Sequence, residues 1–416
     1  MWRGCQEACG HTESESSQTQ PCDRIKKHCG LRAQRSWDEV PMPVIVQKYG
    51  GSSVSSVDKI RRVAERIAAT RAEGHDIVAV VSAMGNTTNE LLTLAHDASG
   101  EPDRRELDML LSVGERITMA LLAMVLCEMG VPARSLTGSQ AGVVTDEVSN
   151  AARVVEVRPD RLKAVLEGGE VAVVAGFQGV SRAREVTTLG RGGSDTTAVA
   201  LTAALEADWC EICSDVDGVW SADPRVVPSA IKLDEITLEE GLALARGGAK
   251  VLYEDAVRYA RDHGIEIVAV SSFGPGSGTR LRPSIDRDRD VFAVTSDTQL
   301  VAIEVSDSSV ALEQRLTALG ARLRHREGTR WLVDTRNVHG SFVCPEGAMP
   351  LGDVARISVV GSRAGERVDV VRRGNAALRG IPWIRSGGTG DVAWWETHRD
   401  DAVVATERLH DAMVRS

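Results

Sequence analysis

The chain has 416 residues, of which 43% are hydrophobic and 4% aromatic, and its formal net charge at pH 7 is -10. This length allows two or three domains. The acidity argues against nucleic acid as a main partner, because phosphate backbones are bound by basic surfaces. We expect no membrane span, because no run of about 18 apolar residues occurs. The N-terminus has no apolar secretory segment, so we expect a cytoplasmic protein.

Residues 1–41 differ in composition from the rest of the chain. They are polar, rich in Ser, Gln and Glu, and show no apolar periodicity. Their cysteines and histidines could bind zinc, but no paired C-x2-C spacing supports such a site. We therefore predict a disordered extension or a mis-assigned start, with Met42 as the alternative first residue. The cysteines concerned are Cys5, Cys9, Cys22 and Cys29.

Residues 42–274 alternate between strand and helix patterns. A strand at 44–46 leads through a Lys-Tyr-Gly-Gly-Ser-Ser turn into a helix with apolar residues at 57, 60, 63, 64 and 67. Further strands are expected at 76–85, 170–180, 208–219 and 265–273, and helices at 106–129, 158–169, 194–207, 237–248 and 252–264. Ser194 or Asp195 is the expected N-cap of the 194–207 helix. Apolar strands that alternate with helices predict a largely parallel sheet covered on both faces.

Two cysteines form a C-x-x-C within "DWCEICSDVDG". That spacing can indicate redox chemistry. The segment reads as a strand, however, and residues three apart on a strand point to opposite faces. We therefore interpret Cys210 and Cys213 as structural residues of a reduced protein.

The pattern changes after residue 274. The segment "GPGSGTRLRPSIDRDRD" combines Gly, Pro and alternating charges, and we assign residues 275–292 to a linker. Residues 293–416 then give two successive units of roughly strand–helix–strand, which suggests a diverged duplication of small α/β modules. We expect this region to regulate the first domain or to dimerise.

Several turns of the first domain combine Gly with hydroxyls or charges, among them "KYGG", "VSAMGNTTNELL", "TLGRGGSDTT" and "SDVDGVWSADPR". Loops at the carboxyl ends of parallel strands converge on one crevice, so these turns predict a ligand site. Their N–H groups, hydroxyls and cations suit a polyanion, although none is a Walker-type P-loop. Glu115, inside an apolar helix, either extends to solvent or binds a cation such as an α-amino group.

Residues from Val44 to about Ser272 resemble aspartate kinases, especially the actinobacterial type. The resemblance is carried by eight motifs in order: "QKYGGSSV", "VVSAMGNTTNELL", "LDMLLSVGERI", "SLTGSQAG", "VAGFQGV", "TLGRGGSDTTAVA", "DVDGVWSADPR" and "GAKVL". It implies an α/β amino-acid kinase fold, a mostly parallel sheet between helices, followed by two small ACT-like α+β modules.

The resemblance also implies roles for individual residues. Lys48 and Asp195 would be catalytic, with Lys48 at the phosphates. The substrate-binding residues would be Ser82, Thr87, Thr88, Glu115, Arg191, Gly192 and Gly193, with Glu115 at the α-amino group and Arg191 at a carboxylate. The ATP-binding residues would be Lys48, Tyr49, Gly50, Gly51, Ser194, Ser214, Asp215, Trp220, Arg225 and Lys250.

The implied reaction is transfer of the γ-phosphoryl group of ATP to the side-chain carboxylate of L-aspartate. Mg²⁺ would be carried on the nucleotide rather than by a protein metal site, and catalysis would consist of positioning and charge neutralisation. The partners implied are L-aspartate, ATP and a second copy bound through the ACT-like modules. Two alternatives stay open: a kinase of another acidic amino acid, or a non-catalytic amino-acid-binding regulator.

The C-terminal region departs from the family pattern. Feedback-inhibited aspartate kinases usually carry a Pro-Gly turn before the helix that faces the effector. The first module here reads "VSDSSVALEQ", and the second has Ala-Gly within "ISVVGSRAGERVDVV". Trp383, Trp394 and Trp395 add bulk where a small effector would bind. We therefore expect weakened or altered feedback by lysine and threonine.

Overall fold

The structure is a computed structural model that describes residues 42–190, 192–249, 251–274, 276–285, 290–306, 310–336, 338 and 341–414. The predicted N-terminal extension, with its four cysteines, lies outside the described residues. Two predicted site residues, Arg191 and Lys250, also lie outside them.

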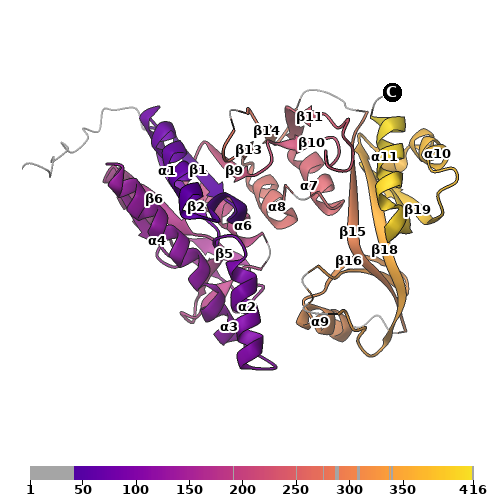
Figure 1. The fold of residues 1–416 in the computed structure, drawn as a ribbon, viewed down its shortest axis with the longest axis horizontal. Coiled ribbons are helices and arrows are strands. Elements are labelled where there is room, and N and C mark those ends of the chain that lie inside the picture. Colours follow the sequence, from indigo (N-terminus) through magenta and orange to yellow (C-terminus); the bar gives the residue numbers. More distant parts are fainter. Residues whose placement is uncertain are drawn as a thin grey trace, which may run out of the picture. The chain divides into compact units, whose positions relative to one another are not determined.

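The first domain is built on an eight-stranded sheet with the strand order β12-β14-β13-β9-β1-β2-β6-β3 (Figure 1). Its neighbouring strands run parallel, apart from the antiparallel pair β13 and β14. This confirms the predicted, largely parallel sheet. The strands are β1 (Val44–Tyr49), β2 (Asp76–Val81), β3 (Ala133–Leu136), β6 (Val171–Ala175), β9 (Trp209–Ser214), β12 (Glu235–Thr237), β13 (Ile267–Ser271) and β14 (Thr279–Arg282).

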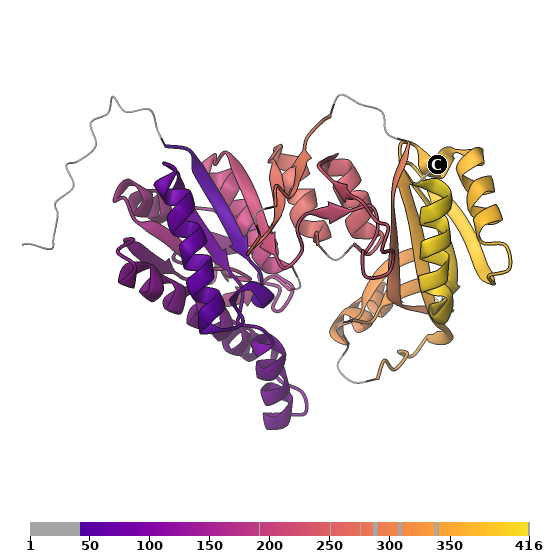
Figure 2. The same ribbon diagram turned by 45° about the horizontal axis from the view of Figure 1, so that its top comes forward.

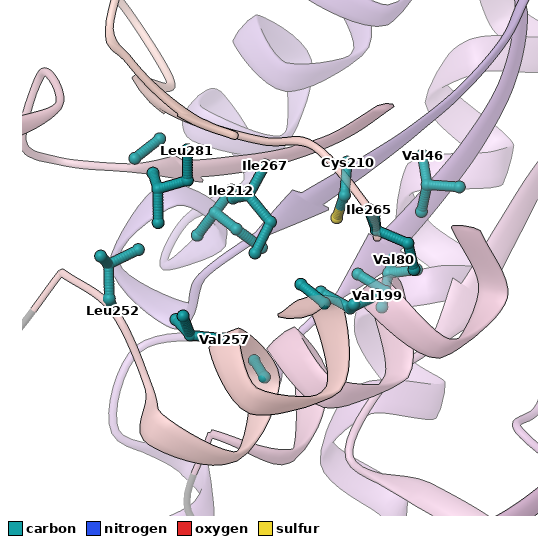
Figure 3. Close-up of a cluster of buried hydrophobic side chains, with 14 of the residues drawn as sticks. Val46, Val80, Val199, Cys210, Ile212, Leu252, Val257, Ile265, Ile267 and Leu281 are labelled. Atoms are coloured by element: carbon teal, nitrogen blue, oxygen red, sulfur yellow. The ribbon is translucent and has the colours of Figure 1, made fainter. Parts of the chain in front are cut away.

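Helices cover both faces of this sheet, as the sequence predicts. On one face, α1 (Val57–Ala72) and α4 (Val113–Glu128) pack through Ile60, Val63 and Leu122 against alternate strand residues. The other face carries α5 (Asp160–Glu167), α6 (Gly193–Leu205), α7 (Leu238–Arg246) and α8 (Glu254–His263). Figure 3 shows part of this second core, where Val199 and Val257 of the helices meet strand side chains.

Cys210 and Cys213 lie on opposite faces of β9, as predicted for residues three apart on a strand. Cys210 belongs to the core under α6 and α8, and Cys213 to the core under α1 and α4. Burial raises the pKa of both thiols well above its ordinary value. A thiol that stays protonated is a poor nucleophile, which supports the structural interpretation.

The long apolar helix predicted at 106–129 is two helices, α3 (Arg104–Leu111) and α4, which are separated at Ser112. The Asp103 side chain caps α3 by accepting from the N–H groups of Arg105 and Glu106. Among the described residues, the stretch Arg104–Glu128 is long and apolar enough to cross a membrane, but 56% of its most apolar window is buried inside the protein. Packing against the sheet accounts for that apolar composition.

Smaller elements surround the carboxyl ends of the sheet. A four-stranded sheet has the order β5-β4-β7-β8, and a two-stranded sheet pairs β10 with β11. Two further short helices, one of them 3-10, lie at this end of the domain. These elements are β4 (Val143–Thr145), β5 (Val154–Val157), β7 (Gln178–Ser181), β8 (Val186–Thr188), β10 (Val219–Trp220), β11 (Lys232–Leu233), η1 (Gly51–Val54) and α2 (Thr87–Ala98).

The C-terminal region forms one six-stranded sheet with the order β16-β17-β15-β18-β20-β19. Its two central strands are long and pair along their whole length, and Figure 2 shows α11 packed along them. The elements are β15 (Val291–Val305), α9 (Val310–Ala318), β16 (Arg322–Glu327), β17 (Arg330–Asp334), β18 (Ala348–Gly361), η2 (Ala364–Glu366), α10 (Val368–Ala377), β19 (Trp383–Thr389), β20 (Val392–His398), η3 (Arg399–Asp401) and α11 (Ala402–Met413).

Two sequence interpretations of this half of the chain were wrong. The segment assigned to a linker at 275–292 contains β14, which pairs with β12 and β13 and so completes the first sheet. Within β14 the buried Thr279 and Leu281 alternate with the exposed Arg280 and the half-buried Arg282, as in an ordinary strand with one face to solvent. The pattern also missed β16 and β19, which form the edges of the C-terminal sheet and carry few buried apolar residues.

Side chains of the C-terminal region contact the first domain at several places, of which two involve buried or nearly buried groups. Glu254, the first residue of α8, pairs with Arg324 of β16 at 3.2 Å. The Nε2 atom of His410, on α11, lies 2.9 Å from the Ser221 hydroxyl, next to β10. Both His410 and Ser221 are almost fully buried.

Candidate active site

A cleft of about 1200 Å³ opens at the carboxyl ends of β1, β2 and β9, where the sequence predicts a ligand crevice. Residues of β15 and α11 line its far side. Fourteen of the predicted site residues line the cleft: Lys48, Gly50, Gly51, Ser82, Thr88, Glu115, Gly192, Gly193, Ser194, Asp195, Ser214, Asp215, Trp220 and Arg225.

Lys48 and Asp195 form a buried ion pair in this cleft. The Lys48 Nζ and Asp195 Oδ1 atoms are 2.6 Å apart, and the two residues are 8% and 2% exposed. Burial alone would lower the pKa of Lys48, but the charge and hydrogen bond of Asp195 outweigh it and hold that pKa above its ordinary value. Lys48 therefore provides a fixed positive charge.

The position of Lys48 differs from the sequence interpretation. The first strand extends to Tyr49, so Lys48 is a strand residue rather than part of the turn. The turn begins at Gly50 and continues into the 3-10 helix η1. A Cβ atom on Gly51 would lie 2.9 Å from the Ala83 carbonyl oxygen, so this turn requires glycine to approach the end of β2.

The helix α6 begins at Gly193, with Gly192 as its N-cap, so the prediction of Ser194 or Asp195 at the cap was wrong. Gly192 has a φ of 75° and a Cβ atom there would lie 2.5 Å from the Tyr253 ring. A left-handed, crowded position excludes the usual capping side chains. Asp195 consequently lies within the first turn, where the helix dipole favours negative charge.

Glu115 is a buried carboxylate that forms no ion pair with any other described residue. It lies in the first turn of α4, is 3% exposed, and its Oε1 atom accepts a hydrogen bond of 3.0 Å from the Ala83 N–H. Its Oε2 atom is buried and has no hydrogen-bond partner among the described residues. Burial raises the pKa of Glu115 to about 7. A cationic ligand group would satisfy both the free oxygen and the charge.

Two predicted binding residues do not line the cleft. Tyr49 is fully buried on the α1 and α4 side of the sheet, where its hydroxyl donates to Gln47 Oε1. It follows Lys48 directly in β1, and neighbouring strand residues face opposite sides. The Thr87 hydroxyl donates to the Met84 carbonyl at 2.7 Å and so closes the turn before α2. Ser82 and Thr88 line the cleft beside it.

The segment that follows β9 lines another part of the cleft. Ser214 and Asp215 lie at the strand end, and Trp220 lies on β10. The Trp220 indole nitrogen is buried without a partner in the described part of the chain, so it can donate to a ligand. Arg225 is largely exposed and makes a bidentate pair with Asp223 at 2.8 and 3.0 Å.

The positions of Arg191 and Lys250 are outside the described residues, so their roles stay predictions. Their chain neighbours Gly190, Gly192, Ala249 and Val251 line the cleft. The structure also adds lining residues to which the sequence analysis assigned no role, among them Asn150, Phe177, Thr188 and Tyr253. Thr188 was within a quoted motif, whereas Asn150 lies in a polar loop that carries no motif.

The sequence model of the amino acid kinase family matches residues 43–271. This match covers more than half of the chain and includes every strand end that forms the cleft, apart from the contribution of the C-terminal sheet. The chain belongs to the amino acid kinase family.

The chain is also similar to individual aspartokinases. It is 57% identical over 245 residues to the aspartokinase of Mycobacterium tuberculosis, a match that covers 59% of this chain and 58% of that protein. The chain thus matches less than two thirds of the length of this relative.

Solved structures extend the likeness to the C-terminal region. The aspartate kinase from Synechocystis is 36% identical, with a TM-score of 0.53, and the match covers 89% of this chain and 69% of that chain. The E. coli aspartokinase III solved in complex with aspartate and ADP has a TM-score of 0.77 at 21% identity, over 89% of this chain and 99% of that one. The second likeness shows the fold, including the C-terminal sheet.

Proposed function

We propose that this protein is an aspartate kinase, which transfers the γ-phosphoryl group of ATP to the side-chain carboxylate of L-aspartate. One observation carries the proposal: a single cleft holds the Lys48–Asp195 ion pair and the buried carboxylate of Glu115, whose Oε2 atom has no hydrogen-bond partner among the described residues. The first suits phosphates, and the second suits an α-amino group. Its likeness to aspartokinases, one of them solved with aspartate and ADP, supports the same substrates.

The geometry suggests how the chain would promote the reaction. The attacking carboxylate and the γ-phosphate are both anionic, so their approach must be offset by fixed positive charge. Lys48 provides that charge from a rigid strand, and Asp195 holds its ammonium group in place. Glu115 would fix the α-amino group, and Arg191 is proposed to bind a carboxylate of the substrate. The nucleotide would bind along Ser214, Asp215 and Trp220.

We propose that ATP binds with Mg²⁺. Within the described residues, no group of three or more His, Cys, Asp or Glu side chains is arranged to hold a metal ion. Asp195 is the cleft carboxylate beside Lys48, so its oxygens are the ones best placed to reach a cation bound to the phosphates. When bound, Mg²⁺ supplies positive charge to the phosphate oxygens.

A substrate comparison tests the proposed activity. ADP release should be measured with aspartate, glutamate and N-substituted aspartates at saturating ATP. We expect release with aspartate only, because a substituted amine would not fit against Glu115. Preference for another acidic amino acid would favour the alternative kinase, and release with none of them would favour a regulator that binds without catalysis.

We also propose that feedback by lysine and threonine is weakened or altered. The Ala-Gly turn of the second module lies in η2, where the backbone N–H groups are already bonded within the chain. The Gly365 N–H donates to the Gly390 carbonyl at 2.8 Å, and the Glu366 N–H to the Arg363 carbonyl at 2.9 Å. Nearby, Arg356 stacks on the Trp394 ring at 3.8 Å. These donors are therefore engaged, and an effector carboxylate would have to displace their present acceptors.

Titration with each amino acid at sub-saturating aspartate tests this proposal. We expect millimolar lysine and threonine, alone or together, to inhibit by less than about half. A working allosteric coupling, by contrast, typically changes affinity by roughly 5–150-fold. Sigmoidal inhibition complete below about a millimolar would contradict it. Such a result would mean that the modules hold effectors through other residues.

We propose that the protein forms a homodimer through its C-terminal sheet. Large apolar side chains are exposed on this region, including Val343, Met349, Leu351, Trp383 and Ile384. Both edge strands of the sheet, β16 and β19, also have an unpaired side. Light scattering should give twice the 44.6 kDa mass of the chain. A monomer at micromolar concentration would refute this proposal.

A further inference from the structure

Asp108 is a fully buried carboxylate that the proposed mechanism does not use. It lies on α3, one turn before the break at Ser112, and is 0% exposed. Its Oδ1 atom accepts from the Asn150 N–H at 3.0 Å and from the Asn150 side-chain amide at 2.7 Å. The same atom accepts from the Thr188 N–H at 3.1 Å and from the Thr188 hydroxyl at 2.5 Å.

The two residues held by Asp108 both line the cleft. Asn150 has a φ of 63°, a left-handed conformation that asparagine tolerates better than most residues with a side chain, and its hydrogen bonds to Asp108 hold it there. The Ala152 N–H donates to the Thr188 carbonyl at 2.9 Å, so the two segments are also bonded to each other. Asp108 is the acceptor that joins them to α3.

The segment after Thr188 leads directly into the substrate end of the cleft. Gly190 and Gly192 both have a φ of 75°, and in the sequence they flank Arg191. Gly190 also approaches the Asn150 carbonyl, since a Cβ atom on Gly190 would lie 3.4 Å from that oxygen. On the other side of Asp108, Ser112 and then α4 lead to Glu115, which lines the same cleft.

We propose that Asp108 is a positioning residue for the amino-acid substrate. It fixes the Asn150 and Thr188 segments relative to α3, and thereby sets the distance between Gly190 and Gly192, the chain neighbours of Arg191, and the α4 terminus that carries Glu115. The inference rests on the proposed function, which identifies the substrate as aspartate. Arg191 would bind a carboxylate of aspartate, and Glu115 would bind its amine. The inference does not involve the nucleotide side of the cleft.

Two neighbouring threonines allow a matched test. Thr188→Val removes the hydroxyl donor to Asp108. Thr187→Val removes an equally buried hydroxyl from the same strand. Thr187 Oγ1 lies 2.6 Å from Thr145 Oγ1, and Thr187 does not line the cleft. Asp108→Asn, which keeps the shape but replaces one acceptor oxygen by an amide group, is a second variant on the carboxylate itself.

We expect Thr188→Val to raise the KM for aspartate about tenfold, with the KM for ATP within about twofold of the wild-type value. Asp108→Asn should raise the aspartate KM at least as much. Thr187→Val should lower the melting temperature by a similar amount to Thr188→Val, yet leave both KM values unchanged. Equal aspartate KM values in the Thr187 and Thr188 variants would overturn the proposal.

Hydrogen exchange in the free protein gives a readout that does not depend on the substrate. Peptides covering residues 147–153 and 186–193 should exchange about tenfold faster in Thr188→Val and Asp108→Asn than in the wild type, and at the wild-type rate in Thr187→Val. A raised KM without faster exchange would indicate direct substrate contact and overturn positioning. If the wild type does not phosphorylate aspartate, the proposed function fails, and the exchange rates alone decide whether Asp108 holds these segments.

Discussion

Replacement of Lys48 by alanine should reduce the kcat of phosphoryl transfer to aspartate by about a hundred- to a thousandfold. The ammonium group lies in the cleft at a fixed position, and no flexible surface cation can replace a charge that is held on a strand and paired at 2.6 Å with Asp195. The loss should appear in kcat measured at saturating aspartate and ATP. Lys163→Ala, on the exposed side of α5, is the matched control and should have wild-type kcat.

The Lys48 variant leaves the Asp195 carboxylate buried without its partner, which destabilises the fold. The double variant Lys48→Ala with Asp195→Asn removes that uncompensated charge, so it should recover melting temperature but not activity. Near-normal turnover in Lys48→Ala, with a wild-type melting curve, would remove Lys48 from the proposed mechanism.

Replacement of Glu115 by glutamine should raise the KM for aspartate about a hundredfold or more and change the KM for ATP little. Glutamine keeps the shape of the side chain and its acceptor for the Ala83 N–H, but it has no charge for an ammonium group to pair with. Loss of one partner of a buried, hydrogen-bonded charge pair typically costs 2–5 kcal/mol or more. An equal rise in both KM values would point to a structural role for Glu115.

The pH dependence of the aspartate KM provides an independent check on the same residue. Burial raises the pKa of Glu115 to about 7, so the free enzyme increasingly holds a neutral carboxyl group as the pH falls below that value. The wild-type KM for aspartate should therefore rise about tenfold per pH unit below 7, since neither the amine nor the carboxylates of aspartate titrate there. The Glu115→Gln variant should show a flat profile between pH 5.5 and pH 8.

The Glu115→Gln variant should bind aspartate more weakly than the wild type but be more stable than the wild type at neutral and alkaline pH. A carboxyl group whose pKa is raised on folding destabilises the folded state above that pKa, and the penalty disappears as the pH falls towards the unfolded value. A rise from 4.5 to about 7 corresponds to roughly 3 kcal/mol at pH 8. Without aspartate, Glu115→Gln should accordingly melt at a higher temperature than the wild type at pH 8, and the difference should be lost near pH 5.

Much of the candidate site could be predicted from the sequence because its residues occur in motifs at strand ends. Lys48 was selected in this way, Asp195 through the family resemblance, and Glu115 through its charge inside an apolar helix; all three line one cleft. Tyr49 was misplaced because a strand that continues by a few residues changes which side chains face the ligand. The N-cap of α6 was misplaced because the packing of the Tyr253 ring, distant in sequence, requires a glycine there.

Asp108 illustrates a residue whose role sequence patterns could not indicate, although it lies within the quoted motif "LDMLLSVGERI". In the sequence it is one acidic residue among the charged residues of an amphipathic helix, where an exposed position would be the usual expectation. Its burial depends on Asn150 and Thr188, which lie 42 and 80 residues further along the chain. Likewise, the short apolar runs of the C-terminal region predicted two modules correctly but could not show that one sheet passes through both.

Because β15 and β18 run without interruption through the C-terminal region, this region would move as a single unit. These strands pair from Val291 with Gly361 at one end to Val305 with Ala348 at the other, and β15 contributes buried residues to the apolar clusters at both ends. A tilt at one end of this strand pair would therefore also move the other end. Thr295 of β15 donates to the Gly247 carbonyl, and Arg324 pairs with Glu254, so a tilt of the sheet would act on Gly247 and Glu254, beside the cleft. Movements started at either end of the C-terminal sheet would thus change the cleft in the same way, and their effects on the cleft would not be independent.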